Sequence, residues 1–190
     1  MKELLKKLNA CQLAREWADD KTIEEIWATC HRGDWMLWLA RKLDIDKRVV
    51  TLAKGHCANT ARHLMKDKRS IAAVDMAIKY GEGNATDSEL AAAADAAYDA
   101  ADAAYAYDAA FAADAFAAYA AADAADAYAD AYVAADAAAY ADAYAAAAYA
   151  AYATDADAYA AAAAAKKNNQ QQTADICRQY LPIKIWNINL

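Results

Sequence analysis

Apolar residues recur at helical spacing through the first 83 residues of the chain. Leu37, Trp38 and Leu43 fall on one side of a helix, and Val49 and Val50 belong to a similar stripe. Aromatic and aliphatic stripes at this spacing are typical of helices that pack into a core. The pattern predicts short helices over residues 2–8, 10–18, 23–29, 35–43, 47–66 and 71–80. No segment of this part has the pattern of a strand, so the predicted fold class is all-α, with an N-terminal bundle of short helices.

Residues with capping chemistry stand at the ends of these predicted helices. Two segments, Thr22–Glu25 and Thr86–Glu89, match the capping box, in which two side chains satisfy free backbone N–H groups of the first turn. Single residues are assigned to other ends: Asn9, Asp34 and Ser70 as N-caps, Gly33 as a turn, and Gly81 as a left-handed helix stop.

The stretch from residue 91 to residue 165 consists almost wholly of Ala, Asp and Tyr, with no Gly, Pro, Lys or Arg. Ala has the highest helix propensity, and no residue here is a strong helix breaker. A single helix of this length would extend about 112 Å, at about 1.5 Å per residue. The Tyr and Phe positions drift from one helical face to another, which indicates a bend, a break or successive partners. A long rod, a folded-back set of helices and pairing of two copies along the Ala face all stay open.

A short closing helix is predicted after this stretch, over residues 174–181, with Thr173 as its cap and Pro182 at its end. The tail, residues 183–190, alternates like a strand but has no sheet to join. We therefore expect three parts: a Trp-rich helical domain (1–83), an Ala/Asp/Tyr-rich helical region (84–167), and a closing helix with its tail (168–190).

Charge is divided unevenly along the chain. The 91–165 stretch holds twelve Asp and no basic residue, whereas the whole chain has 20 Lys+Arg and 27 Asp+Glu, so the remainder carries a surplus of positive charge. This asymmetry permits the acidic stretch to dock on the chain's own basic helices or on a basic partner. No apolar run reaches the roughly 20 residues of a membrane span, and the first residues are charged. We expect a cytoplasmic protein whose four cysteines are reduced thiols.

The densest chemical cluster is the segment 30–38, which combines Cys, His, Arg, Asp and Trp. Aromatic and basic side chains together can enclose a small nucleotide-like ligand, and Arg32 is expected to pair with a nearby acid. Four residues of the segment are candidate binding residues: Arg32, Asp34, Trp35 and Trp38. The cysteines and histidines lack zinc-knuckle spacing and no Cys–His pair is recognisable, so we predict no metal, cofactor or catalytic residue.

The acidic face of the Ala-rich stretch is the second candidate surface. Asp123, Asp126 and Asp130 fall together on one side of a helical wheel, away from the neighbouring Tyr residues. Spaced carboxylates can imitate phosphates, and such a face would suit a basic, nucleic-acid-binding toxin.

Several segments carry a family resemblance: Ala10-Cys11, Trp17, Thr22–Trp27, Cys30–Trp38, Arg69–Val74, Tyr80–Ala85, Glu89-Leu90 and Asp175–Leu181. Together they resemble the Imm-5-like family of immunity proteins from bacteria and phages. The chain departs from that family at His31, where Pro is common, and in the Ala-rich stretch, where relatives interleave Arg rather than Asp. The resemblance implies a toxin-neutralising or defence-related binding role.

The leading hypothesis is a non-enzymatic binding protein of toxin-immunity or phage counter-defence type, acting by stoichiometric association with a protein partner. Sequestration of a small nucleotide-like ligand is an alternative within this class. The competing hypothesis is structural, a spacer or oligomerisation arm built on the Ala-rich helix. Nucleic acid is not an expected partner, because acidic residues interleave the basic ones and the total charge is negative. An enzyme is the least supported class.

Overall fold

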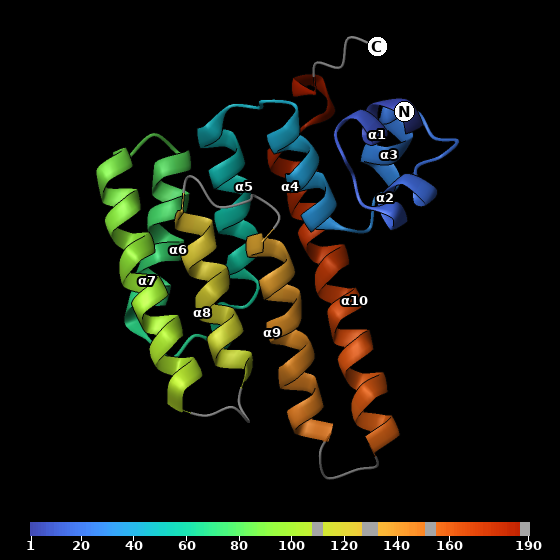
Figure 1. Ribbon diagram of the computed structural model, residues 1–190. Coiled ribbons are helices and arrows are strands. Elements are labelled where there is room, and N and C mark those ends of the chain that lie inside the picture. Colours follow the sequence, from blue (N-terminus) through green and yellow to red (C-terminus); the bar gives the residue numbers. More distant parts are fainter. Residues whose placement is uncertain (108–111, 127–132, 151–154, 187–190) are drawn as a thin grey trace.

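The computed structural model describes residues 1–107, 112–126, 133–150 and 155–186, which form helices and no strand (Figure 1). The predicted all-α fold class is confirmed. The first four helices are short: α1 (Lys2–Lys7), α2 (Gln12–Trp17), α3 (Ile23–Thr29) and α4 (Gly33–Lys42). The middle of the chain forms α5 (Lys47–Asn59), the 3₁₀ turn η1 (Arg62–Leu64) and α6 (Lys68–Gly81). Four long helices and a 3₁₀ turn follow: α7 (Asp87–Tyr107), α8 (Ala112–Ala125), α9 (Val133–Ala150), α10 (Asp155–Tyr180) and η2 (Ile183–Ile185).

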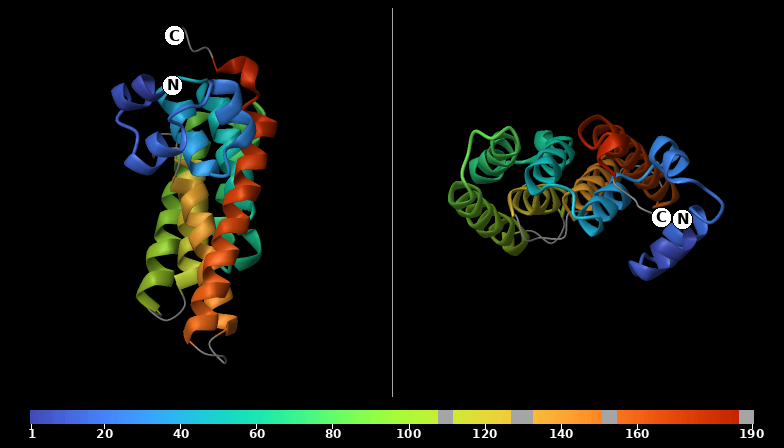
Figure 2. Two further views of the ribbon diagram at one scale, coloured as in Figure 1. Left: turned by 90° about the vertical axis from the view of Figure 1, so that its right-hand side faces the viewer. Right: turned by 90° about the horizontal axis from the view of Figure 1, so that it is seen from above.

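The Ala-rich stretch is folded back on itself and is not a single rod. α7 packs against α8, α8 against α9 and α9 against α10, and successive helices run in opposite directions (Figure 1). α6 contacts α7 and α8, while α5 contacts α4, α6, α8, α9 and α10. The helices α5 and α6 therefore form a second layer against α7, α8 and α9, and the end of α10 lies beside α5 (Figure 2). The drift of the aromatic positions corresponds to separate helices that meet different neighbours.

Alanine provides most of the core between α5, α6 and the Ala-rich helices. The fully buried residues of α8 are Ala117, Ala120, Ala121, Ala122, Ala124 and Ala125. A methyl side chain lets two helices approach closely but buries little area, and burial stabilises by about 25 cal/mol per Å². Val74, Tyr80 and Leu90 are buried in the same core and add the larger apolar area that methyl groups lack.

A second core, richer in large side chains, joins the first four helices to α5 and α10. Its buried members include Leu5, Ile26, Leu37, Val50 and Leu181. The helices α1, α2 and α3 have only six or seven residues each, too few for a stable isolated helix. They stand as a small group beside α4, and packing on this core holds them in place (Figure 1).

Both predicted capping boxes are confirmed. The backbone N–H of Glu25 donates to Thr22 Oγ1 at 3.2 Å, and that of Thr22 donates to Glu25 Oε2 at 2.7 Å. The Thr86–Glu89 pair makes the same two bonds, at 3.3 Å and 2.8 Å. Pro182 follows the end of α10, as expected.

Several single-residue assignments are wrong, because the residues predicted to cap a helix or to form a turn lie inside helices. The N-cap of α4 is Arg32, and Asp34 lies in the first turn with its carboxylate bound to Arg32 rather than to the backbone. Gly33 is the first helical residue and not a turn. Ser70 is buried within α6, whose N-cap is Asp67.

The remaining differences concern where helices end. Asn9 follows α1 in a left-handed conformation (φ 59°) instead of capping α2, and the left-handed glycine after α6 is Gly83 (φ 85°), not Gly81. α5 ends at Asn59 rather than near residue 66. The expected closing helix, 174–181, is the last part of α10, so no helix begins at Thr173, and residues 183–185 form a 3₁₀ turn instead of a strand.

Gly33 allows the closest approach between α4 and α10. A Cβ atom at this position would lie 2.5 Å from Thr173 Oγ1 and 2.6 Å from the backbone carbon of the same residue. The thiol of Cys177, one turn further along α10, donates to the carbonyl oxygen of Gly33 at 3.5 Å. Only glycine fits here without a shift of one helix against the other.

We expect Gly33→Ala to lower the free energy of unfolding by about 1–3 kcal/mol, because backbone atoms of α10 occupy the place of the new methyl group. This loss should exceed the gain of about 1 kcal/mol in helix propensity. Urea unfolding followed by circular dichroism measures the difference.

Gly55→Ala is the matched control, since the nearest atoms there lie further away: side-chain atoms of Ile78 at 3.0 Å and of Ala77 at 3.2 Å, and the backbone nitrogen of Ile78 at 3.2 Å. Its effect should be smaller. A Gly33→Ala protein as stable as the parent would contradict the close packing of α4 on α10.

Candidate functional site

A cavity of about 410 Å³ lies between the α1–α3 group and α4, with one wall residue from α9. All five tryptophans of the chain line it: Trp17, Trp27, Trp35, Trp38 and Trp186. We call it the tryptophan cavity. Its volume falls within the range of about 300–1,000 Å³ that is usual for small-molecule sites, and its walls are mainly apolar with a few polar groups, as in such sites.

The end of α10 fixes two of the five rings. The carbonyl oxygen of Leu181 accepts hydrogen bonds from Trp27 Nε1 and from Trp186 Nε1, each at 2.9 Å. The last carbonyl groups of a helix have no partner within that helix. Here two indole N–H groups satisfy one of them, and this ties α3 and the segment after α10 to the same point.

The α2 side of the cavity is an aromatic cluster. The ring centres of Trp17 and Trp35 are 6.0 Å apart, and His31 packs against both, at 5.9 Å and 6.1 Å. Tilted rings at these distances attract each other through their quadrupoles. The contacts hold α2 against the start of α4, although the two helices are short.

Arg32 and Asp34 form the principal ion pair of the cavity wall. Arg32 Nε donates to Asp34 Oδ1 at 2.7 Å, and Nη2 donates to Oδ2 at 2.5 Å. The Asp34 side chain is only 8% exposed, and the guanidinium carbon lies 4.8 Å from the Trp35 ring centre. This two-fold bond raises the pKa of Arg32 further above its ordinary value. The guanidinium is therefore always charged, and its charge is compensated by Asp34.

Asp136 brings a second carboxylate to the cavity, from the first turn of α9. Burial raises its pKa above the ordinary value, and the negative charge of Asp34 acts in the same direction. Lys166 and Arg32 act in the opposite direction. Lys166 is not a lining residue; its ammonium group lies 3.4 Å from the ring centre of Tyr140. The described part of the lining thus holds one guanidinium and two carboxylates.

The cysteine and histidine chemistry of the segment 30–38 does not assemble a metal centre. All four cysteines are free thiols, and burial raises the pKa of Cys30, a lining residue, to about 11, so it is neutral at neutral pH. Within the described ranges no cluster of three or more His, Cys, Asp or Glu side chains is arranged to hold a metal ion. The charged side chains among the described lining residues are therefore the ion pair and Asp136, and Asn9 adds an amide.

The structure brings the four candidate residues of the Trp-rich segment together, since Arg32, Asp34, Trp35 and Trp38 all line the cavity. Sequence reasoning missed the other three tryptophans as members of one site, although Trp content was a usable signal. It also missed Asp136, one of twelve aspartates in a repetitive stretch, which no local pattern distinguishes.

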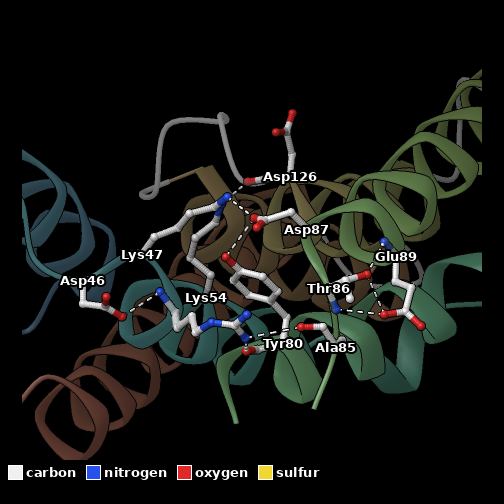
Figure 3. A network of polar contacts seen from close by, with 10 residues as sticks. Asp46, Lys47, Lys54, Tyr80, Ala85, Thr86, Asp87, Glu89 and Asp126 are labelled. Carbon is white, nitrogen blue, oxygen red and sulfur yellow. Dashed lines mark hydrogen bonds and ion pairs between the residues drawn. The ribbon is translucent and has the colours of Figure 1, made fainter. Parts of the chain in front are cut away.

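The acidic candidates lie elsewhere, about α8. Asp123 is 6% exposed and accepts a hydrogen bond from the Tyr98 hydroxyl at 2.5 Å. Burial raises its pKa, and the buried Lys54 acts against that rise. The main-chain oxygen of Asp126 accepts a bond from Lys54 Nζ at 2.7 Å, while its carboxylate is directed away from that lysine (Figure 3). Asp130 lies outside the described residues.

Basic residues at the start of α5 are also engaged within the chain (Figure 3). Lys47 forms an ion pair with Asp87, which accepts a further bond from the Tyr80 hydroxyl at 2.9 Å. Arg48 donates to the main-chain oxygen of Tyr80 at 2.6 Å and its guanidinium lies over the Tyr80 ring. These contacts join α5 to the α6–α7 connection, so part of the basic band serves the fold.

Comparison with protein-family models, with curated proteins and with solved structures finds no match for this chain. The resemblance to the Imm-5-like family therefore stays a prediction from the sequence. In the described part of the chain, no helix combines the length and the apolar character needed to cross a membrane.

We expect Asp136→Asn to raise the melting temperature at neutral pH. Because the pKa of Asp136 is raised, the folded chain binds this proton more tightly than the unfolded chain does, and the ionised carboxylate lowers stability as the pH rises above the ordinary value of 3.8. Thermal unfolding at several pH values measures the difference, which should vanish as the pH falls toward that value.

The exposed Asp95 of α7 offers a matched control, and Asp95→Asn should change the melting temperature much less. If Asp136→Asn lowers stability at neutral pH instead, the carboxylate has a stabilising partner and its burial has no net cost.

Proposed function

We propose that the protein is a non-enzymatic binding protein that holds one small, flat aromatic ligand in the tryptophan cavity. The observation that carries this proposal is the convergence of all five tryptophans on one ligand-sized cavity, together with a few charged groups. Stacking of a heteroaromatic ring on an aromatic side chain contributes about 1–3 kcal/mol. Several rings around one volume can therefore supply most of the affinity that a small ligand needs.

Two features favour this site over the acidic face as the main binding surface. Asp123, the most central of the acidic candidates, is buried and bonded within the bundle. A buried carboxylate that is hydrogen-bonded within its own protein is not accessible to the basic surface of a partner. The tryptophan cavity, in contrast, combines apolar walls with charges that remain next to open volume.

The folded-back arrangement of α7–α10 weighs against the spacer hypothesis. An arm needs a helix that extends away from the body, whereas these helices pack side by side and share a core with α5 and α6. The immunity or counter-defence setting that the sequence resemblance implies is compatible with the proposal. A protein that sequesters a ligand acts by stoichiometry and requires no turnover.

Removal of single rings provides the test. Quinoline, a neutral bicyclic heteroaromatic compound, and adenosine are titrated into the protein by isothermal titration calorimetry, with tryptophan fluorescence as the second readout. We expect one ligand per chain for at least one of them, and Trp35→Leu and Trp38→Leu should each weaken binding about tenfold, the loss of one stacked ring.

Tyr144→Leu is the control for the loss of an aromatic ring, because this exposed side chain of α9 does not line the cavity. It should leave the affinity unchanged. The proposed function would be overturned if Trp35→Leu and Trp38→Leu left binding unchanged. It would also be overturned if no aromatic probe bound, including the cation N-methylquinolinium.

A further inference from the structure

We infer that the tryptophan cavity selects a positively charged aromatic ligand, held by the Asp136 carboxylate and the tryptophan rings. The inference rests on the proposed function, since it names the charge of the ligand for that same cavity. The inferred ligand has the flat ring of a nucleotide-like compound but carries no phosphate. The observations behind it are the charges of the lining and the way they are paired.

The described wall of the cavity has one more carboxylate than it has basic side chains. Arg32, the cation among the described lining residues, is held by both oxygens of Asp34 at 2.7 Å and 2.5 Å. This two-fold bond uses two of the five N–H donors of the guanidinium and places a compensating negative charge directly beside it. Asp136 is the second carboxylate next to the cavity. Lys166 of α10 attracts it, but this lysine lies over the Tyr140 ring and does not line the cavity.

An anionic ligand would meet this arrangement at a disadvantage. A phosphate in the cavity would lie close to two carboxylates and to a guanidinium whose charge Asp34 already compensates. Like charges repel strongly in partly buried sites because water screens them poorly. A cation is attracted by the Asp136 carboxylate and gains from the negative faces of the surrounding indole rings. Arg32 repels it, but the charge of Arg32 is compensated by Asp34.

Tryptophan is the aromatic side chain that attracts cations best, and rings that enclose a cation from several sides are the usual way to bind it without a dedicated counter-ion for each face. Trp17 and Trp35 are already 6.0 Å apart in a tilted arrangement, and Arg32 lies over one of them at 4.8 Å. Two further rings of the lining have a lysine of the chain over them, Trp17 with Lys21 at 4.6 Å and Trp38 with Lys42 at 5.9 Å, and neither lysine lines the cavity. Three rings of the wall thus already make cation–π contacts with side chains of the chain. A ligand cation would extend the same interaction to the rings that face the open volume.

Three compounds that share one ring system but differ in charge test whether the charge of the ligand determines its affinity. N-methylquinolinium carries a permanent positive charge, quinoline is neutral, and quinaldate is the carboxylate anion of the same bicycle. Calorimetric titration of each into the full chain should show N-methylquinolinium binding at least about tenfold more tightly than quinoline, the order expected for a desolvated cation–π contact with a carboxylate nearby. Quinaldate should bind more weakly than quinoline.

Asp136→Asn identifies the residue responsible. We expect it to reduce the preference for N-methylquinolinium over quinoline to about threefold or less, while the affinity for quinoline stays the same. Asp142→Asn is the matched control, because Asp142 belongs to the same helix and is also partly buried, but it does not line the cavity. It should leave the preference intact.

The outcomes separate the inference from the proposed function. Equal affinities for quinoline and N-methylquinolinium, tighter binding of quinaldate, or a preference that survives Asp136→Asn overturns the charge selectivity and leaves an aromatic-binding cavity standing. Failure of all three compounds and of adenosine overturns both. Because quinoline binding by the same variant serves as the control, a loss of cation preference with the quinoline affinity intact is not a consequence of unfolding.

Discussion

The last turns of α10 organise the N-terminal part of the molecule. The close approach at Gly33 sets the start of α4 directly on Thr173, and the carbonyl of Gly33 receives the Cys177 thiol. Arg178 then donates to the main-chain oxygens of Cys30 at 2.8 Å and of Trp27 at 3.2 Å. One residue past the helix end, the Leu181 carbonyl holds two indole rings. The short helices at the start of the chain are thereby attached to the end of the chain, and the tryptophan cavity lies where the two meet.

Sequence reasoning succeeds where a local signal exists. Capping boxes at Thr22 and Thr86 are recognisable because two complementary side chains stand three residues apart, and both form. The cluster from Arg32 to Trp38 stands out by composition, and it does line a cavity. The Ala-rich stretch offers no such signal, since it has no Gly or Pro to mark where its helices end. The separate helices α7 to α10 arise from packing against α5 and α6, which depends on the whole fold.

Tertiary contacts also decide the residues that were misassigned. Ser70 and Gly81 have the chemistry of a cap and a stop, yet one is buried in α6 and the other lies against Leu52, where a Cβ atom would come within 2.4 Å. Asp136 could not be singled out for the opposite reason, because eleven other aspartates in the stretch have the same local surroundings. Its place beside Arg32 and Asp34 follows from how α9 packs on α4. A site built from segments about a hundred residues apart is specified by the fold rather than by a motif.

Several of the twelve aspartates of the Ala-rich stretch lie partly or wholly inside the bundle. Asp123, Asp136 and Asp142 are buried or partly buried, and burial raises the pKa of each. The Tyr98 hydroxyl donates a hydrogen bond to Asp123, and the charge of Lys54 favours the ionised form of this carboxyl. The Asn169 amide donates to Asp142 at 2.7 Å. Asp136 differs because it borders open volume, so a ligand can supply its compensation. Since α1, α2 and α3 are too short to persist alone, a ligand bound against their tryptophans would stabilise them as well. We therefore expect ligand binding in the cavity to stabilise the structure of the first 29 residues, because both depend on the same contacts.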